Sequence, residues 1–336
     1  MNMLIIKLGA IGDVIRTTAV LKGLKEKYTD SKIFWAAKKE SFGILKNNNL
    51  IENIFDIENK DEIKKIDCDL VISLDDDDEA CSLASAVKAK KIIGAYMKNS
   101  EKSYTEDSSL WFDMGLISKF SRKKADALKA KNRKTYQEIM YKILGLEYRK
   151  QEPMLILDKE GLDFGKKFAE KNNIKNNDLV IGINTGAGGR WQDKKLSAEE
   201  TALLIDKLNN SLKNENIKIL LFGGPEEAER NKKIIKSINS SVIDTGCDNS
   251  LMEFASLVNL CTILITSDSL ALHIGTALKK KIVSFYYPTS VKEIETYGRG
   301  IKIMGKGKDY CSYKTKCDEP AKWDIDEMVD AIRELI

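Results

Sequence analysis

The residues best suited to chemistry lie in the stretch 261–288, which contains the only histidine of the chain, His273. An apolar run there is followed by Asp268 and Ser269, then by apolar residues at helical spacing, and then by a second apolar run. This pattern predicts a strand, a turn, a helix and a strand. At the carboxyl edge of a parallel sheet, such a helix start offers free N–H groups to an anion. The alternative is that Asp268 or Ser269 caps the helix and that His273 packs beneath the sheet.

Asp13 is a second candidate, because it follows the first apolar run, 3–8, and the glycine-containing turn 9–12. A helix is predicted to begin here, so one interpretation is a helix cap or a first-turn acid favoured by the helix dipole. The other is a carboxylate at the open end of the first strand, where substrates bind. The turn lacks the G-x-G-x-x-G fingerprint, so a nicotinamide cofactor is not indicated.

Five acidic residues, 75–79, follow another apolar run that ends at Leu74. Such a run usually forms a solvated loop and a helix start. Because it follows a buried strand, Asp75, Asp76 and Asp77 could also face a substrate and bind a cation or a positively charged group. The sequence leaves both interpretations open.

Two turns in the second half of the chain have the composition of phosphate-binding loops. Thr185 and Gly186 open the first turn, whose glycines allow the backbone to approach a ligand closely. Arg190 and Lys194 follow within reach of a diphosphate.

The second of these turns carries Glu226 and Glu227, whose carboxylates suit the hydroxyl groups of a ribose. Each turn alone is a weak signal. Together with the turn at Asp268, however, they would place three ligand-binding turns on strand ends of one domain. This combination favours a nucleotide or a sugar nucleotide as ligand.

Alternating apolar runs and helical patterns position these residues. The alternation predicts α/β domains with parallel strands at 3–8, 32–36, 53–57, 70–74 and 91–95, and at 179–184, 218–222, 242–244, 263–265 and 282–286. A polar stretch, 171–177, separates the two sets. We therefore expect an N-terminal domain over 1–172, a C-terminal domain over 173–322, and a terminal helix over 323–336 that could pack back on the N-terminal domain.

The composition limits the possible classes of protein. The 336 residues are 43% hydrophobic and 32% charged, which is typical of a globular chain long enough for two domains. No apolar run is long enough to span a bilayer and no signal peptide is indicated, so we expect a cytoplasmic protein. The six cysteines are scattered and histidine occurs once, so neither a disulfide framework nor a metal site is expected.

A basic stretch, 122–134, follows two aromatic residues, Trp111 and Phe112. Its basic residues are Arg122, Lys123, Lys124, Lys129, Lys131, Arg133 and Lys134. The stretch could be a solvated helix face, or it could contact the anionic cytoplasmic surface of a membrane together with the aromatic residues. The net charge of only +4 and the lack of a recognisable motif argue against nucleic acid as a partner.

Four segments together resemble the heptosyltransferases of glycosyltransferase family nine. They are IIKLGAIGDVIRT (5–17), INTGAGGRWQDKKL (183–196), FGGPEEAE (222–229) and TSDSLALHIGTALKKKIVSFYYPTS (266–290). The resemblance implies an α/β GT-B architecture, in which two Rossmann-like domains with parallel sheets face each other across a cleft. It also implies an inverting transferase that moves a sugar, above all heptose from ADP-heptose, onto a lipid-linked lipopolysaccharide or other surface-glycan acceptor, with no cofactor and no metal.

The resemblance further implies roles for individual residues. Asp13 matches the family's catalytic carboxylate and would act as general base. The nucleotide-sugar donor would be bound by Thr185, Gly186, Arg190, Lys194, Glu226, Glu227, Asp268, Ser269 and His273. From their positions after strands of the N-terminal domain, and not from the resemblance, Gly12, Asp75, Asp76 and Asp77 are candidates for the acceptor side. The alternatives are a sugar-nucleotide epimerase or hydrolase of the same fold, and a noncatalytic nucleotide-binding module.

Overall fold

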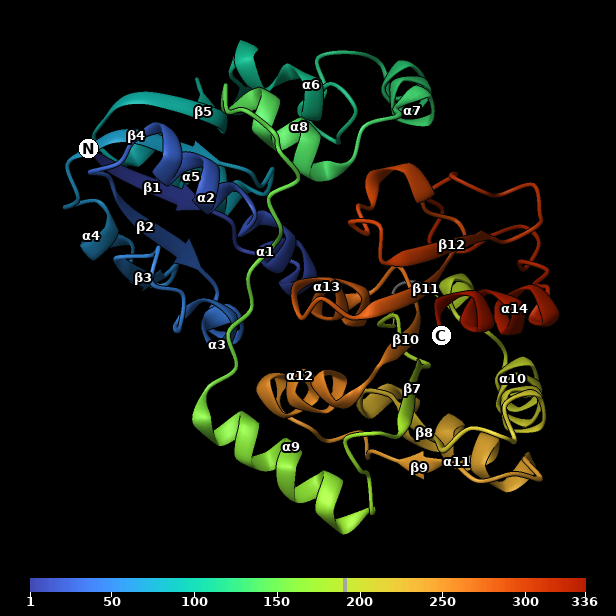
Figure 1. Ribbon diagram of the computed structural model, residues 1–336. Helices are drawn as coiled ribbons and strands as arrows, with labels where there is room; N and C mark the ends of the chain where they lie inside the picture. Colours follow the sequence, from blue (N-terminus) through green and yellow to red (C-terminus); the bar gives the residue numbers. More distant parts are fainter. Residues whose placement is uncertain (190–191) are drawn as a thin grey trace. The chain divides into compact units, whose positions relative to one another are not determined.

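A computed structural model describes residues 1–189 and 192–336. The chain divides into two compact units. Unit 1 comprises residues 1–156 and 292–295, and unit 2 comprises residues 157–291 and 296–336. Each unit has a six-stranded sheet with helices packed against it (Figure 1).

The sheet of unit 1 has the strand order β3-β2-β1-β4-β5-β6. Its strands are β1 (Asn2–Ile6), β2 (Lys32–Ala37), β3 (Asn53–Asp56), β4 (Cys68–Ser73), β5 (Ala89–Lys98) and β6 (Glu101–Tyr104). The first five are parallel, and β6 runs antiparallel to β5. β1 and β4 are almost entirely buried, as expected for parallel strands covered on both faces.

The helices of unit 1 connect these strands and follow β6. They are α1 (Ile11–Thr17), α2 (Val20–Lys27), α3 (Phe42–Leu45), α4 (Lys60–Ile63), α5 (Asp78–Ala86), α6 (Ser109–Phe112), α7 (Arg122–Lys131) and α8 (Tyr136–Ile143). α8 starts with a capping box, in which the side chains of Thr135 and Glu138 bond each other's backbone N–H groups.

The sheet of unit 2 has the order β12-β11-β10-β7-β8-β9, and its paired strands are all parallel. Its strands are β7 (Leu179–Asn184), β8 (Ile217–Phe222), β9 (Ile243–Asp244), β10 (Ile263–Ser267), β11 (Lys281–Tyr286) and β12 (Gly300–Met304). Counted from the first strand of each unit, both sheets have the order 3-2-1-4-5-6 of Rossmann folds. The predicted class, two Rossmann-like α/β domains, is confirmed, whereas β6 and β12 were not predicted.

The helices of unit 2 cover its sheet. They are α9 (Lys159–Lys171), α10 (Ala198–Ser211), α11 (Ala228–Ser237), α12 (Leu251–Leu260), α13 (Leu270–Ala277) and α14 (Ile325–Leu335). One core includes Ile183 and Ile265 of the sheet together with Met328 and Ile332 of α14.

The two units differ from the domains expected from the sequence. α9 lies in unit 2, where Ser256 Oγ of α12 donates a hydrogen bond to Gly161 O. The boundary therefore falls between residues 156 and 157 instead of in the polar stretch 171–177. α14 packs on unit 2, where its apolar face completes the core. The sequence left open which domain this helix packs on, because local composition does not show which neighbour a helix contacts.

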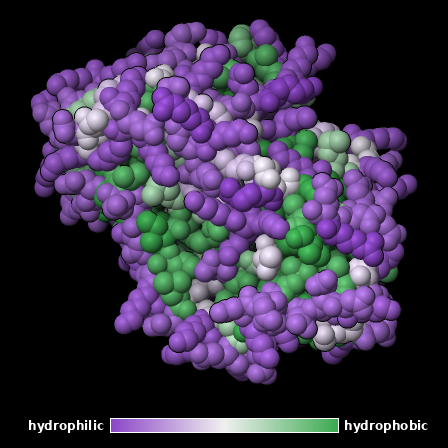
Figure 2. All heavy atoms as spheres, in the orientation of Figure 1, coloured by the Kyte–Doolittle hydropathy of each residue, from purple (hydrophilic) through white to green (hydrophobic). Residues whose placement is uncertain are grey.

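Of the two aromatic residues predicted at a membrane contact, Phe112 is not exposed, whereas Trp111 is half-buried. Phe112 is buried and stacks on Tyr104, with 5.5 Å between ring centroids, and Trp111 packs edge-on against Tyr136. The apolar surface near α7 comes instead from the segment between α6 and α7 (Figure 2), in which Leu116 is 76% exposed. None of the described helices is both long and apolar enough to cross a membrane.

Candidate functional site

The strand order creates a switch point in each sheet. In unit 1, β1 and β4 are neighbours, but the strands that follow β1 are added on one side of the sheet and those that follow β4 on the other. The neighbours β7 and β10 have the same arrangement in unit 2. Ligands of open α/β sheets bind outside the carboxyl ends of the strands at such a point. The predicted turns after these four strands therefore lie where a ligand is expected.

Asn184, the last residue of β7, connects the two turns at the switch point of unit 2. Its Nδ2 lies 3.2 Å from Thr266 Oγ1, 3.2 Å from Ser269 Oγ and 2.7 Å from Gly186 O. The hydroxyls of Thr266 and Ser269 lie 3.0 Å apart. Because Asn184 is buried, this network fixes the two turns relative to each other.

Lys194 approaches the turn after β10 from the segment that follows β7. Its Nζ lies 3.2 Å from Asp268 Oδ2 and donates to Asp268 O at 3.1 Å. Lys194 is only 8% exposed, so the ion pair is largely shielded from solvent. The structure thus brings together two residues that the sequence analysis assigned to one anion site, and a bound diphosphate would compete with Asp268 for the ammonium.

α13 begins at the same turn. Ser269 occupies the N-cap position, but its side chain makes no cap hydrogen bond and contacts Thr266 and Asn184 instead. His273 is half-buried, whereas the following four residues of the helix are buried. Ser269 therefore does not cap the helix through its hydroxyl, and His273 is only partly buried.

The two glutamates of the turn after β8 differ in their surroundings. Glu227 is 4% exposed; its Oε1 lies 2.6 Å from Lys195 Nζ, and its Oε2 accepts a hydrogen bond from its own turn. A Cβ at Gly186 would lie 2.9 Å from Glu227 Oε2, so glycine is needed for this approach. Glu226 is exposed and lies against Gly189. Glu227 therefore holds two turns together, and Glu226 presents its carboxylate at the surface.

Thr185 points into unit 2. Its hydroxyl lies 2.9 Å from Phe222 O and 2.8 Å from Asn231 Oδ1, and its carbonyl accepts a hydrogen bond from Arg230 at 3.2 Å. Its N–H also donates to Phe222 O at 3.2 Å, so Thr185 anchors the turn after β7 with both its side chain and its backbone. Arg190, the remaining donor-side candidate, lies outside the described residues.

In unit 1, Asp13 lies in the first turn of α1, just beyond the carboxyl end of β1. The N-cap is Ala10, and no side chain caps this helix. Asp13 Oδ1 lies 2.8 Å from Arg16 Nη2, and the Asp13 side chain is 32% exposed. Asp13 is therefore a first-turn acid and not the cap, and its carboxylate reaches solvent at the switch point.

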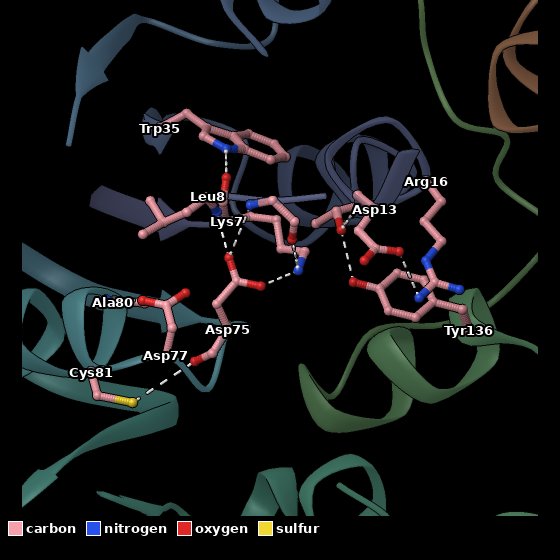
Figure 3. Close-up of polar contacts among 12 residues, drawn as sticks. Lys7, Leu8, Asp13, Arg16, Trp35, Asp75, Asp77, Ala80, Cys81 and Tyr136 are labelled. Carbon is pink, nitrogen blue, oxygen red and sulfur yellow. Dashed lines mark hydrogen bonds and ion pairs between the residues drawn. The ribbon is translucent and has the colours of Figure 1, made fainter. Parts of the chain in front are cut away.

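Arg16 and Tyr136 surround Asp13 (Figure 3). The Arg16 guanidinium lies 3.8 Å from the centroid of the Tyr136 ring. Thr17 Oγ1 donates to Asp13 O at 2.6 Å and lies 2.7 Å from the Tyr136 hydroxyl, which must therefore be the donor to Thr17. Burial raises the pKa of Tyr136, so the hydroxyl stays protonated at neutral pH.

The acidic run after β4 contains residues with different tasks. Asp75 is buried and forms an ion pair with Lys7. Asp77 is the N-cap of α5 and accepts a hydrogen bond from its first turn at 2.8 Å. Asp78 and Glu79 form ion pairs with surface lysines. The solvated-loop interpretation therefore fits residues 77–79, whereas Asp75 has a buried position that the sequence did not indicate.

The other residues predicted on the acceptor side are less prominent. Asp76 is half-buried, and Gly12 is buried within α1. Among the residues that the structure describes, no group of three or more His, Cys, Asp or Glu side chains is placed to hold a metal ion.

Three important residues were missed by the sequence analysis: Lys7, Asn184 and Tyr136. For Lys7 and Asn184 the available signal was a single polar residue at the end of an apolar run, where polar side chains are rarely buried without a partner. Tyr136 gave no such signal, because its partner Thr17 lies 119 residues away in the chain.

The chain is similar in sequence to known heptosyltransferases. Lipopolysaccharide heptosyltransferase 1 of Campylobacter coli is 26% identical over 343 residues, which cover 93% of this chain and 94% of that protein. A shorter match to lipopolysaccharide heptosyltransferase 2 of Salmonella typhimurium, 29% identical, covers 25% of each chain.

Two solved structures have the same fold. The glycosyltransferase family 9 protein of Veillonella parvula superimposes with a TM-score of 0.79 at 19% identity and covers 99% of this chain and 96% of that one. The E. coli heptosyltransferase WaaC with ADP gives a TM-score of 0.66 at 17% identity, with both chains fully covered (100% each). Residues 59–323 match the model of a whole family. The chain belongs to glycosyltransferase family 9, the heptosyltransferases.

Proposed function

We propose that this glycosyltransferase moves heptose from ADP-heptose onto a lipopolysaccharide or other surface-glycan acceptor, with Asp13 as general base. The observation that carries the proposal is the contact of Lys194 with Asp268 just before the start of α13, at the switch point of unit 2. The names of the similar proteins support heptose as the sugar, and the ADP bound to the E. coli relative supports the nucleotide.

The proposed reaction needs no cofactor. The acceptor oxygen attacks the anomeric carbon of the donor as the bond from that carbon to the diphosphate oxygen breaks. Asp13 takes the proton of the acceptor hydroxyl, and ADP leaves with the bonding electron pair. Lys194, the free N–H groups of α13 and His273 would stabilise the departing diphosphate. Glu226, whose carboxylate is at the surface, suits the ribose hydroxyls better than the buried Glu227.

Donor identity is tested by thermal unfolding with ADP, GDP, UDP, ADP-heptose and NAD. A ligand at 100 times its Kd stabilises the folded protein by about 2.7 kcal/mol. We expect ADP and ADP-heptose to raise the Tm and the other compounds to leave it unchanged. Stabilisation by NAD alone would contradict the proposal. Stabilisation by UDP or GDP instead of ADP would show that the donor carries that nucleotide.

The role of Asp13 is tested with Asp13→Asn, which keeps the shape but cannot take a proton. Transfer to a panel of lipopolysaccharides with progressively shortened cores should fall by roughly 10²–10⁴-fold, the usual contribution of a general base. ADP binding should stay unchanged, because the donor residues lie in unit 2. Asp30→Asn, at an exposed aspartate, is the control. Unchanged turnover would remove Asp13 as base, and release of sugar without acceptor would indicate a hydrolase.

We also propose that α7 touches an anionic membrane surface. Among its ten residues only Ala125 is buried, and five are lysine or arginine. Phe120, over which Lys124 Nζ lies at 3.5 Å, and the exposed Leu116 precede it. Co-sedimentation with phosphatidylglycerol vesicles but not with phosphatidylcholine vesicles is expected, and it should weaken when Lys123 and Lys124 are replaced by Glu. Equal binding to both vesicle types would contradict the electrostatic contact.

A further inference from the structure

A buried ion pair bridges the switch point of unit 1. Lys7 follows β1, Asp75 follows β4, and the two residues are 5% and 9% exposed. The ends of their strands are level, because Ile6 pairs with Ser73. The pair therefore occupies the edge of the sheet at which Asp13 also lies.

Asp75 uses both carboxylate oxygens on the turn that leads to α1 (Figure 3). Oδ1 contacts Lys7 Nζ, and Oδ2 accepts a hydrogen bond from Leu8 N, with Gly9 N at 3.4 Å. Lys7 Nζ in turn donates to Gly9 O at 2.7 Å. The backbone of Leu8 and Gly9 is thus held by Asp75, which lies just after β4 and 66 positions beyond Gly9 in the chain.

This external support matters because α1 has no cap of its own. Ala10, the N-cap, offers no side-chain acceptor, and its carbonyl accepts the hydrogen bonds from Asp13 N at 2.8 Å and Val14 N at 3.0 Å. Asp13 is therefore attached to the sheet through Ala10 and the Gly9 turn. A shift of that turn would move the carboxylate of Asp13 directly.

The charges of the pair also affect Asp13. Although burial alone lowers the pKa of Lys7, the carboxylates of Asp75 and Asp13 outweigh burial and hold that pKa above its ordinary value. Lys7 is therefore an ammonium at neutral pH, and its charge acts on Asp13 as well as on Asp75.

We propose that Lys7 and Asp75 are positioning residues for Asp13: together they hold the turn after β1 so that the base faces the acceptor. The inference rests on the proposed role of Asp13. It assigns Asp75 to the support of the base, whereas its position after a buried strand had made Asp75 a candidate for the acceptor side.

The test compares four variants with the full-length protein. Asp75→Asn removes the charge but keeps the shape, Lys7→Met removes the ammonium, and the double variant Lys7→Met with Asp75→Asn leaves no unpaired charge if a single variant fails to fold. Val71→Ala, on the same buried strand β4, is the control for lost stability alone.

For Asp75→Asn we expect kcat to fall roughly 10–100-fold, since small misplacements of a catalytic group have effects of this size. The KM for ADP-heptose should stay unchanged, and the protein should remain folded at the assay temperature. Lys7→Met should also lower kcat without changing the KM for ADP-heptose, because the hydrogen bond from Lys7 Nζ to Gly9 O is lost. Val71→Ala should not change kcat.

A second readout does not depend on activity. Amide hydrogen exchange in the peptide that spans 8–17 should be faster in Asp75→Asn, and in the double variant, than in Val71→Ala of matched Tm. Unchanged exchange in this peptide would overturn the inference, as would a kcat that follows only the folded fraction. If Asp13→Asn keeps full turnover, the proposed function fails. If Asp13→Asn loses turnover while Asp75→Asn keeps it, only the inference about Lys7 and Asp75 is contradicted.

Discussion

At the scale of single residues, the largely buried ion pair between Lys194 and Asp268 is the centre of the proposed anion site of unit 2. Burying a charged side chain costs solvation free energy, which a nearby partner of opposite charge offsets. Removing one partner therefore leaves the other as an uncompensated buried charge. A diphosphate would offer the ammonium a second anionic partner and would leave Asp268 near solvent. Lys194 is therefore the residue on which donor affinity should depend most.

Replacing Lys194 by Met should weaken ADP binding by roughly 10–100-fold, since a hydrogen bond to a charged group contributes about 1.5–3 kcal/mol. The measurement is the Kd from calorimetric titration. Lys213→Met, at an exposed lysine of unit 2, should leave the Kd unchanged. Equal affinity in both variants would show that the diphosphate binds elsewhere.

Three buried thiols have their titration shifted by the fold. Burial raises the pKa of Cys68 and of Cys81 to about 11, and that of Cys261 to about 12. Because the pKa is raised, the folded state favours the protonated thiol, and folding loses stability as the pH rises from the ordinary thiol pKa through these values.

At pH 8 these three thiols should therefore react with Ellman's reagent far more slowly in the native protein than in urea. Stopped-flow absorbance at both conditions measures the difference. Single Cys→Ala variants identify the slow thiols. Each such variant should lack part of the absorbance change that appears only when the protein is unfolded in urea. Rapid native reaction of all six cysteines would contradict the buried positions.

At the scale of secondary-structure elements, the contact between α9 and α12 requires glycine. A Cβ at Gly165 would lie 2.5 Å from Ser256 Oγ, although alanine is otherwise the better helix former by about 1 kcal/mol. The close approach explains why α9 belongs to unit 2, and it makes a prediction in which packing opposes helix propensity.

Gly165→Ala should lower the free energy of unfolding by about 1–3 kcal/mol, the usual cost of overpacking. In a Ser256→Ala background the obstructing oxygen is absent, so the same change should be neutral or stabilising. Urea unfolding of the four proteins completes the thermodynamic cycle. Additive effects would show that the two helices separate to accept the methyl group.

At the scale of the whole molecule, the last helix completes the core of unit 2. Met328 and Ile332 are fully buried against the sheet, which explains the strong apolar face of α14. Residues 328 and 332 therefore support the same sheet that carries the proposed donor site after β7.

Met328→Ala should cost about 2–5 kcal/mol of unfolding free energy, as expected for a fully buried methionine. Asp330→Ala, on the exposed side of the same helix, should change stability by less than about 0.5 kcal/mol. Both values come from urea titrations followed by circular dichroism. Similar values for the two variants would mean that α14 is not part of the core.

The sequence by itself determined the two Rossmann-like sheets and the turns that carry the candidate residues. This worked because a buried parallel strand needs a continuous apolar run and a helix start needs characteristic residues, both of which are local properties. Asp13, Lys194, Asp268 and Ser269 were found in this way, and the structure places each of them at the carboxyl edge of its sheet.

Only the tertiary structure decided which of these residues meet. Lys7 and Asp75 lie 68 positions apart, and Lys194 and Asp268 lie 74 apart, so their pairing depends on the order of strands in the sheet. The same holds for α9 and α14, whose packing partners lie far away in the chain. Long-range contacts follow from the burial of the whole core, which no local stretch of sequence specifies. Because of these contacts, the run of five acidic residues contains a buried ion-pair partner, Asp75, a helix cap, Asp77, and surface residues.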